Sequence, residues 1–480
     1  MLTYDLSENN GESLYLYIYE CIRQDILNGN LESNYALPSK RAFASNLGVS
    51  NITVENAYAQ LMAEGYIYSL PRKGFFVTPL SELTIGIQNP RKTSSSDANT
   101  SSAILTKNSM ESDYDNEETI DLTGRALLPD AFPFSIWAKL TREILSSKQR
   151  ELLTPPPSAG VHSLRGAIAN YLRDFRDMAV APEQIIIGAG TEYLYGLIMQ
   201  LIGFDKIYGI ENPGYSKIRK IYSSYDARWV PVDMDSNGIN VESLLASKTQ
   251  ILHTSPSHHF PLGYVTPISR RRELINWLSD SDDRYIIEDD YDSEFRLNGK
   301  AIPTLKSIDT TGRIIYMNTF NKSLSSTIRI SYMVLPPALL EQFNEQLSFY
   351  SCSVPTFEQY TLAEFLSRGY FEKHLNRMRT RYKKIKAALL SEIKNSPQLS
   401  RGIISQENGG LHFIFSIDNG LDDNYVLKKA KERGLKLASL SQYYLENSEG
   451  CVPTGSYIIN YSSLTEEQIP TVVALLEEIL

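Results

Sequence analysis

The stretch NTFNKSLSSTIRISYMVLP, residues 318–336, sets one lysine in a run of small and polar side chains, followed by an arginine and an apolar segment. It continues RIIYMNT, whose apolar, β-branched composition is typical of a buried strand. Ligands of α/β proteins bind beyond the carboxyl edge of the parallel sheet, where Lys322 is expected. Thr319 and Arg329 are near enough in sequence to converge on one anionic group, and arginine offers bidentate donors. The competing interpretation is a solvated surface lysine.

Short apolar runs similar to RIIYMNT recur between helical segments over residues 120–480. This alternation indicates a parallel α/β sheet. The stretch 80–119 is rich in Ser, Asn, Asp, Glu and Thr, and it cannot bury enough apolar surface to offset its ordering entropy. We therefore expect a first domain over 1–79, a flexible linker over 80–119 and a second domain over 120–480.

The 480-residue chain is too long for one core, and its 42% hydrophobic and 21% charged residues are ordinary for a globular protein. No apolar run is long enough to span a bilayer, and the first residues do not resemble a signal peptide. The three cysteines lie far apart, with neither disulfide nor zinc spacing, so we expect a cytoplasmic protein without a metal site. The net charge of −9 argues against coating nucleic acid by bulk charge.

Helical spacing in residues 14–28 ends at Asn28-Gly29, a normal helix stop. Ser39 is a plausible N-cap for a helix through KRAFASNL, and Gly48 makes a tight turn. Ser50 or Asn51 can cap the next helix, ITVENAYAQLMAEG. Two helices joined by a short glycine turn predict a helix-turn-helix, whose second helix can enter the major groove of DNA.

The segment YIYSLPRKGFFVTP predicts two strands around a cationic tip, PRKG. Residues 1–80 carry five Lys and Arg against eight Asp and Glu, so this region is not basic overall. Four of the five cations nevertheless gather at two places, the start of the first helix of the motif and the hairpin tip, as positioning on phosphates requires. The alternative is a small helical domain with a solvated charged turn.

In order and spacing, LPSKRAFASNLGVSNITVENAYAQLMAEGYI…RKGFFV resembles the winged helix-turn-helix of the GntR family over residues 12–78. Recognition helices of that family usually carry a cation near Asn51, whereas this chain has Asn51 and Glu55, so base preference cannot be carried over. The resemblance implies that a double-stranded DNA operator is contacted by Ser39, Lys40, Arg41, Ser50, Asn51, Thr53, Lys73 and Gly74.

Pyridoxal phosphate (PLP) needs an amine for its aldehyde, an anionic partner for its pyridine nitrogen, a surface that stacks on the ring and donors for its phosphate. Lys322 is the candidate amine. RYIIEDDYDSEFR places Asp289 or Asp290 at the end of a strand, where a carboxylate can keep the ring nitrogen protonated. Solvated loop acids are the alternative interpretation for Asp290 and Asp292.

IIIGAGTEYLYGLIMQL predicts a strand, a glycine turn and a helix whose first N–H groups, at Gly190 and Thr191, can hold phosphate. IENPGYSKIRK places Tyr215 after a strand, where it can stack on the ring, although simple packing is the usual role of a tyrosine. TSPSHHFPLGYV adds Ser257 and His258 at another junction of strand and loop.

Taken together, these motifs resemble a fold-type I, PLP-dependent aminotransferase, and the joined architecture resembles the MocR/GabR subfamily of GntR regulators. ENPGY, PSHHFPLG, IEDDYDSEFR and TFNKSLSSTIRISYMVLP stand in the family's order. The resemblance implies a domain-swapped homodimer in which Lys322 forms a Schiff base with PLP. It also implies that Asp289 pairs with the pyridine nitrogen, Tyr291 lies near the ring hydroxyl, Tyr215 stacks on the ring, and Thr191, Thr319 and Arg329 hold the phosphate.

The sequence departs from aminotransferases where they place an arginine for the substrate carboxylate. Ile458 stands there, and an unpaired buried carboxylate costs several kcal/mol. GabR-like proteins have an arginine just after the stacking tyrosine, where this chain has Lys217 and then Arg219. Pro155 stands where an intersubunit tyrosine is common. These losses disfavour an efficient transaminase and are compatible with a sensor.

The leading hypothesis is a PLP-binding transcription regulator that senses PLP itself and controls the supply of vitamin B6, as PdxR-type members do. A regulator that senses an amine or amino acid is the second hypothesis. An aminotransferase with an accessory domain is the third, and a PLP-free binding domain on a degenerate scaffold is the fourth.

Overall fold

The computed structural model describes residues 2–4, 6, 13–71, 73–79, 119–124, 128–297, 303–407, 410–445 and 452–480. The chain divides into two compact units, and each is described by itself. The linker expected over 80–119 lies outside the described residues, except for its last position. Arg72, at the expected hairpin tip, also lies outside them.

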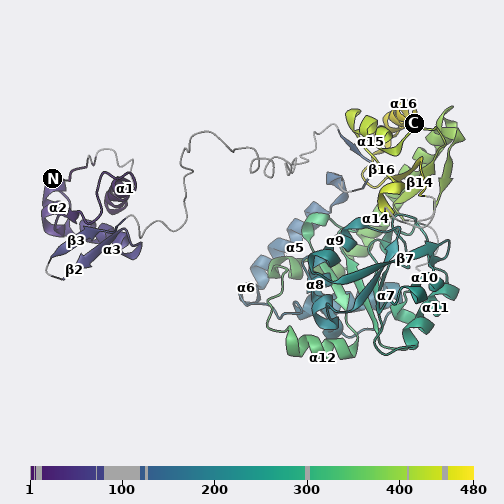
Figure 1. Ribbon diagram of the computed structural model, residues 1–480, viewed down its shortest axis with the longest axis horizontal. Coiled ribbons are helices and arrows are strands. Elements are labelled where there is room, and N and C mark those ends of the chain that lie inside the picture. Colours follow the sequence, from purple (N-terminus) through teal and green to yellow (C-terminus); the bar gives the residue numbers. More distant parts are fainter. Residues whose placement is uncertain are drawn as a thin grey trace, which may run out of the picture. The chain divides into compact units, whose positions relative to one another are not determined.

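The first unit packs helices against a small antiparallel sheet (Figure 1). Its helices are α1 (Leu14–Leu27), α2 (Lys40–Leu47) and α3 (Asn51–Ala63). Its strands, β1 (Ala36–Leu37), β2 (Ile67–Leu70) and β3 (Gly74–Val77), pair in the order β1-β3-β2. The two-residue β1 was not expected, because a strand that short leaves no alternating pattern in the sequence.

Local sequence explains the helix boundaries in this unit. The Ser39 hydroxyl accepts a hydrogen bond from the Ala42 N–H at 3.3 Å, and Gly48 ends α2 in the left-handed region at φ 69°. The Ser50 hydroxyl accepts from the Thr53 N–H at 3.1 Å, so Ser50 rather than Asn51 caps α3. Apolar faces of all three helices meet in one core, which includes Ile18, Ile22, Ile26, Phe43, Val54, Tyr58, Leu61 and Val77.

The second unit is built on an eight-stranded sheet of order β5-β12-β11-β10-β9-β6-β7-β8. The strands are β5 (Ile185–Gly188), β6 (Ile207–Asn212), β7 (Arg228–Asp235), β8 (Gly238–Ile239), β9 (Ile251–Thr254), β10 (Tyr285–Asp289), β11 (Ile314–Thr319) and β12 (Ser331–Val334). Every strand expected from an apolar run is present. Five neighbouring strands, in the order β7-β6-β9-β10-β11, are parallel to one another.

The expectation of a parallel sheet is wrong at β12 and β8. The strand β12 runs antiparallel to both β11 and β5, and β8 runs antiparallel to β7. Only a turn and a short 3-10 segment connect β11 to β12, and a parallel return needs a longer crossover, usually through an α-helix. The lysine-bearing segment is therefore a return loop between two antiparallel strands.

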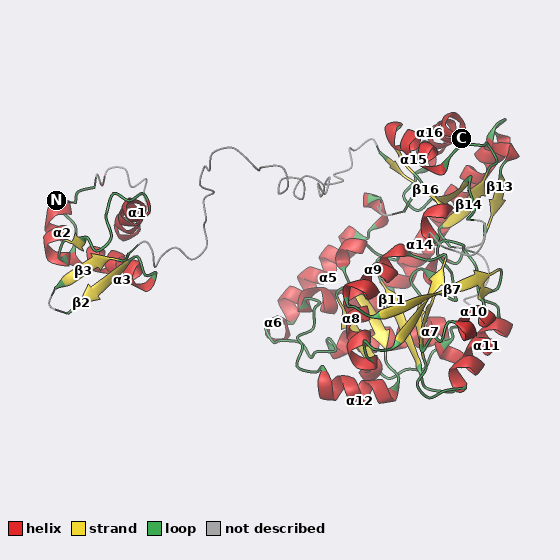
Figure 2. Ribbon diagram, in the orientation of Figure 1, coloured by secondary structure: helices red, strands yellow, loops and turns green. Residues whose placement is uncertain are grey.

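Helices cover both faces of the large sheet (Figure 2). Residues of the central strands alternate between the cores on these two faces. Ile315, Met317 and Met333 pack against α8 (Thr191–Ile202), α9 (Ser216–Ser224) and α12 (Pro337–Gln346). Tyr316 and Tyr332 belong to the core on the opposite face. The helices of that face are α7 (His162–Arg176), α10 (Val241–Ala246), α11 (Ile268–Ser279) and α13 (Thr356–Ser367), with α5 (Phe134–Ser147) packed on α13 and followed by α6 (Gln149–Leu152).

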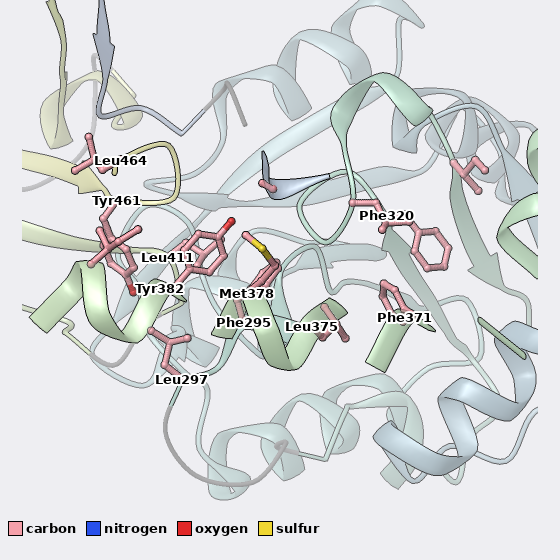
Figure 3. Packing of buried hydrophobic residues seen from close by; sticks show 14 of the residues in the cluster. Phe295, Leu297, Phe320, Phe371, Leu375, Met378, Tyr382, Leu411, Tyr461 and Leu464 are labelled. Carbon is pink, nitrogen blue, oxygen red and sulfur yellow. The ribbon is translucent and has the colours of Figure 1, made fainter. Parts of the chain in front are cut away.

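The long helix α14 (Tyr370–Asn395) leads to a second, antiparallel sheet of order β13-β14-β17-β16. Met378 of α14 lies beside Phe295, and Phe371 at the start of α14 lies near Phe320 (Figure 3). The strands are β13 (Ile403–Ser405), β14 (His412–Ser416), β16 (Ala438–Ser439) and β17 (Ser456–Asn460), flanked by α15 (Asp423–Glu432) and α16 (Ile469–Ile479).

The segment that enters the second unit is paired with this C-terminal region. Strand β4 (Ile120–Asp121) runs parallel to β15 (Leu435–Lys436), and the Asn460 N–H donates to the carbonyl of Leu122 at 2.9 Å. Across the described residues, none of the helices is both long and apolar enough to cross a bilayer.

Candidate ligand site and DNA-binding surface

Most of the candidate ligand residues follow strands that end at one edge of the large sheet. Because β6, β9, β10 and β11 are parallel, their carboxyl ends lie at the same edge. The strand β5 shares that direction, since it is antiparallel to β12 and β12 is antiparallel to β11. Asp289 is the last residue of β10, and the loops that begin at this edge carry Gly190, Tyr215, Ser257, His258, Tyr291 and Lys322.

Lys322 is a shielded amine near two carboxylates. Its Nζ donates a hydrogen bond to the carbonyl of Gly124 at 2.7 Å. Burial lowers the pKa of Lys322, although the carboxylates of Asp292 and Asp121 act in the opposite direction. A lowered pKa increases the share of neutral amine, which is the form that attacks an aldehyde.

One carboxylate oxygen of Asp289 accepts a hydrogen bond, and the other has no hydrogen-bond partner among the described residues. The Tyr195 hydroxyl donates to Oδ2 at 2.6 Å, while Oδ1 is buried and has no hydrogen-bond partner among the described residues. His253 Nε2 is 3.7 Å from Oδ2, which is too long for a hydrogen bond. A buried free carboxylate oxygen fits a protonated ring nitrogen such as that of PLP. Asp289 therefore satisfies one requirement of the cofactor.

His258 and Tyr291 form a second group at this edge. His258 Nδ1 lies 2.8 Å from both carboxylate oxygens of Asp292 and 3.3 Å from the Tyr291 hydroxyl. Burial, and then the Asp292 charge, raises the pKa of Tyr291 well above its usual value, so its hydroxyl stays protonated. Its ring stacks on His258, with centroids 6.0 Å apart.

The alternative interpretation of Asp290 and Asp292 as solvated loop acids is wrong, because both side chains are buried. Asp290 forms an ion pair with Arg176 of α7 and accepts from the Tyr316 hydroxyl at 2.6 Å. Asp292 pairs with His258. Both acids are buried because each has a cationic or imidazole partner inside the unit.

The start of α8 and the Arg329 guanidinium lie together. Gly190 precedes the helix with φ 94°, and a Cβ there would lie 2.5 Å from Arg329 Nη2. Arg329 Nη2 donates to the carbonyl of Ala189 at 3.1 Å and to Glu192 Oε2 at 2.9 Å. The Gly190 N–H donates to the carbonyl of Gly188 at 2.9 Å, so the N–H groups left for a ligand are those of the first turn of α8, beginning at Thr191. These N–H groups, the positive end of the helix dipole and a guanidinium together suit a phosphate. Only glycine leaves room for this approach.

Thr319, Ser257 and Tyr215 have other contacts in the structure. The Thr319 hydroxyl accepts from Ser331 Oγ at 2.8 Å, which orders the turn before Lys322, and the structure shows no contact between Thr319 and Arg329. Ser257 Oγ accepts from Arg176 Nη2 at 3.4 Å. Tyr215 is 49% exposed and meets Phe260 edge-on, with ring centroids 6.1 Å apart.

Sequence reasoning missed Tyr195 and Glu192. Tyr195 is four residues after Thr191 on α8, so helical spacing places both on one face. This spacing could have indicated from the sequence that Tyr195 lies near the predicted site. Glu192 gave none, because an acidic residue in the first turn of a helix is ordinary.

The first unit presents most of its predicted DNA contacts on the surface. Arg41, Asn51, Lys73 and Gly74 are exposed, although the Ser39 and Ser50 hydroxyls cap helices. Lys40 forms an ion pair with Glu55 of α3, with Nζ 2.5 Å from Oε1. One of the predicted phosphate contacts is thus already paired with a carboxylate.

Comparisons with known proteins agree with both halves of this description. Residues 14–77 match the family described as bacterial regulatory proteins, gntR family. Over 95% of its length the chain is 34% identical to the uncharacterized HTH-type transcriptional regulator YdeL of Bacillus subtilis, covering 94% of that protein.

Two further relatives have more informative names. The chain is 29% identical, over 94% of its length and 90% of the relative, to the probable rhizopine catabolism regulatory protein MocR of Rhizobium meliloti. It is 28% identical, over 92% of its length and 90% of the relative, to the HTH-type pyridoxine biosynthesis transcriptional regulator PdxR of Corynebacterium glutamicum.

Among solved structures, an archaeal alanine:glyoxylate aminotransferase superposes with a TM-score of 0.66 at 24% identity. The match covers 75% of this chain and 90% of the aminotransferase. The likeness shows that the second unit has the fold of the fold-type I aminotransferases.

Proposed function

The chain belongs to the MocR/GabR subfamily of GntR-type transcription regulators, and we propose that its aminotransferase-like unit binds PLP and uses it as a signal. The proposal rests on one observation above the others: the same sheet edge carries a shielded amine at Lys322 and a buried carboxylate oxygen without a hydrogen-bond partner at Asp289. A binding domain without a ligand would gain nothing from either group.

The residues fit the four polar groups of the ligand. PLP, when bound, supplies an aldehyde that condenses reversibly with an amine and releases water. Lys322 would hold the aldehyde end, Asp289 the ring nitrogen, and Arg329 with the N–H of Thr191 at the start of α8 the phosphate, while Gly190 leaves room for the guanidinium. Tyr291 would donate to the ring hydroxyl, because its raised pKa keeps its own proton in place.

We propose that PLP is itself the effector and that the regulated genes supply vitamin B6. Ile458 supports a sensor, since it stands on β17 where an aminotransferase places its carboxylate-binding arginine and is only 2% exposed. The name of PdxR, a pyridoxine biosynthesis regulator similar over nearly the whole chain, points the same way.

An amine or amino acid that reacts with bound PLP is the second candidate effector. A pocket beside Tyr215 is lined in part by Glu211, Arg219 and His253. Within the described parts of the chain, Arg219 forms no ion pair, so its charge is available to a carboxylate ligand.

We further propose that the regulator is a cytoplasmic, domain-swapped homodimer, and that PLP alters the arrangement of its domains and hence its affinity for an operator. Light scattering on the full chain, with and without PLP, would measure its mass and shape.

The deciding experiment is DNA binding by the full chain after removal of PLP, measured by fluorescence anisotropy on DNA from upstream of its own gene. We expect PLP to change the affinity and Lys322→Ala to abolish that change. The matched control is Lys384→Ala, which removes an exposed lysine of α14. Borohydride reduction followed by peptide mapping should place the ligand on Lys322.

The alternative outcomes are distinct. A change in DNA affinity that requires an added amine as well as PLP would favour the second effector. Sustained turnover of an amino donor with a keto acid would favour an enzyme. Absence of DNA binding with or without ligands would refute the proposed function.

A further inference from the structure

Glu192, the second residue of α8, places a carboxylate between two cations. Its Oε2 accepts from Arg329 Nη2 at 2.9 Å, and its Oε1 forms an ion pair with Lys217 Nζ of α9. The three side chains come from α8, α9 and the loop before β12, so the contact ties three elements together.

The cation that Glu192 occupies is the one proposed to hold the phosphate of PLP. Arg329 Nη2 lies so close to Gly190 that a Cβ there would be 2.5 Å away, and the first turn of α8, beginning at Thr191, supplies the N–H groups at the helix start. A phosphate bound to those groups must share Arg329 with Glu192 or displace it. Phosphate and carboxylate are both anions, and like charges at such a site repel each other.

We propose that Glu192 is an internal competitor for the phosphate group, which weakens the binding of PLP enough to keep it reversible and leaves the binding of a ligand without phosphate unchanged. This inference rests on the proposed function of the site. The pairs with Lys217 and Arg329 keep the pKa of Glu192 below its usual value, although burial acts against them, so the competitor is charged at neutral pH.

A purely structural role for Glu192 makes a different prediction. An acidic side chain in the first turn stabilises a helix through the helix dipole, and it does so whichever ligand is present. Competition with phosphate, by contrast, affects only ligands that carry a phosphate. Pyridoxal, which has the same aldehyde and ring without the phosphate, separates the two roles.

The test compares PLP and pyridoxal binding to full-length wild type and Glu192→Gln by spectroscopic titration. We expect Glu192→Gln to bind PLP about tenfold more tightly, with a slower release, and to bind pyridoxal as the wild type does. Inorganic phosphate should raise the melting temperature of the variant more than that of the wild type. Glu242→Gln, which removes an exposed first-turn acid of α10, should change none of these values.

Equal changes for PLP and pyridoxal, or no change for PLP, would overturn the inference while leaving the proposed function intact. Failure of wild type to bind either compound would instead refute the proposed function. If Glu192→Gln does not fold, Glu192→Ala gives the same comparison, because it also removes the charge.

Discussion

The hydroxyl of Tyr195 holds one carboxylate oxygen of Asp289 at 2.6 Å and leaves the other without a partner. The tyrosine lies on α8 and the aspartate ends β10, so the helix that begins at the proposed phosphate site also orients the proposed partner of the ring nitrogen. The proposed sites for the phosphate and for the ring nitrogen of PLP are therefore both positioned by α8.

Tyr195→Phe should weaken PLP binding about tenfold, because Asp289 loses the charge-assisted donor that fixes its orientation. Asp289→Asn should cost more, since an amide cannot stabilise a protonated ring nitrogen. Spectroscopic titration with PLP measures both effects, and Tyr425→Phe, at an exposed tyrosine of α15, is the control. Unchanged affinity in Tyr195→Phe would show that the hydrogen bond has no part in binding.

Glu55→Gln should strengthen DNA binding about threefold and steepen its salt dependence, because Lys40 is released to contact phosphate. The pair is partly exposed and contributes little to stability, so the melting temperature should hardly move. Anisotropy at several salt concentrations makes the measurement. Glu32→Gln, at an exposed acid of the same unit, controls for the general loss of negative charge. An equal gain in both variants would exclude a specific effect of the Lys40 pair.

Ile52, the second residue of α3, is 68% exposed. The first residues of a recognition helix contact base edges, and an apolar side chain there can contact the methyl group of thymine. We expect Ile52→Ser to weaken operator binding about fivefold on normal DNA and hardly at all when deoxyuridine replaces thymidine. Leu16→Ser, on the exposed side of α1, is the control. The same loss on both DNAs would contradict a methyl contact.

Glu211 should make stability fall as the pH rises. Burial raises its pKa to about 7, against an ordinary 4.5, so its contribution is complete below pH 4.5 and is lost as the pH rises through 7. The difference corresponds to at most about 3 kcal/mol. The glutamine variant cannot ionise, and it should therefore gain stability relative to wild type between pH 4.5 and 7.

Denaturant unfolding at several pH values measures this difference for Glu211→Gln. The side chain accepts from the Thr254 hydroxyl at 2.6 Å and the Ser255 N–H at 2.8 Å, and the amide oxygen of glutamine can keep both bonds. Glu242→Gln should give a curve parallel to that of wild type. Parallel curves for all three proteins would show that Glu211 does not titrate in this range.

The elements of the fold were largely predictable, because their signals are local. Ser39, Gly48 and the apolar runs determine where helices and strands begin and end, and each is visible in a few consecutive residues. The direction of β12 was not predictable from its own composition, since an apolar strand looks the same in either direction. It depended on the lack of a crossover helix after β11.

In the site, too, residues within sequence motifs could be predicted, whereas contacts between residues far apart in the chain could not. The resemblance to a known family assigned Lys322, Asp289 and Arg329, and their roles remain proposals. No local pattern could show that Asp290 pairs with Arg176, more than a hundred residues earlier, or that Glu192 meets Arg329. Burial of an acid depends on partners that the chain brings from elsewhere.

The contact between Lys322 and Gly124 would add a mechanical role to the chemical role proposed for this amine. Gly124 follows a short strand paired to β15 and packs against Asn460 at the end of β17. An amine that bonds to a ligand can no longer donate to the Gly124 carbonyl in the same way. Binding of a ligand at Lys322 would therefore directly change a contact of the first residues of the second unit. These residues follow the DNA-binding unit in the sequence.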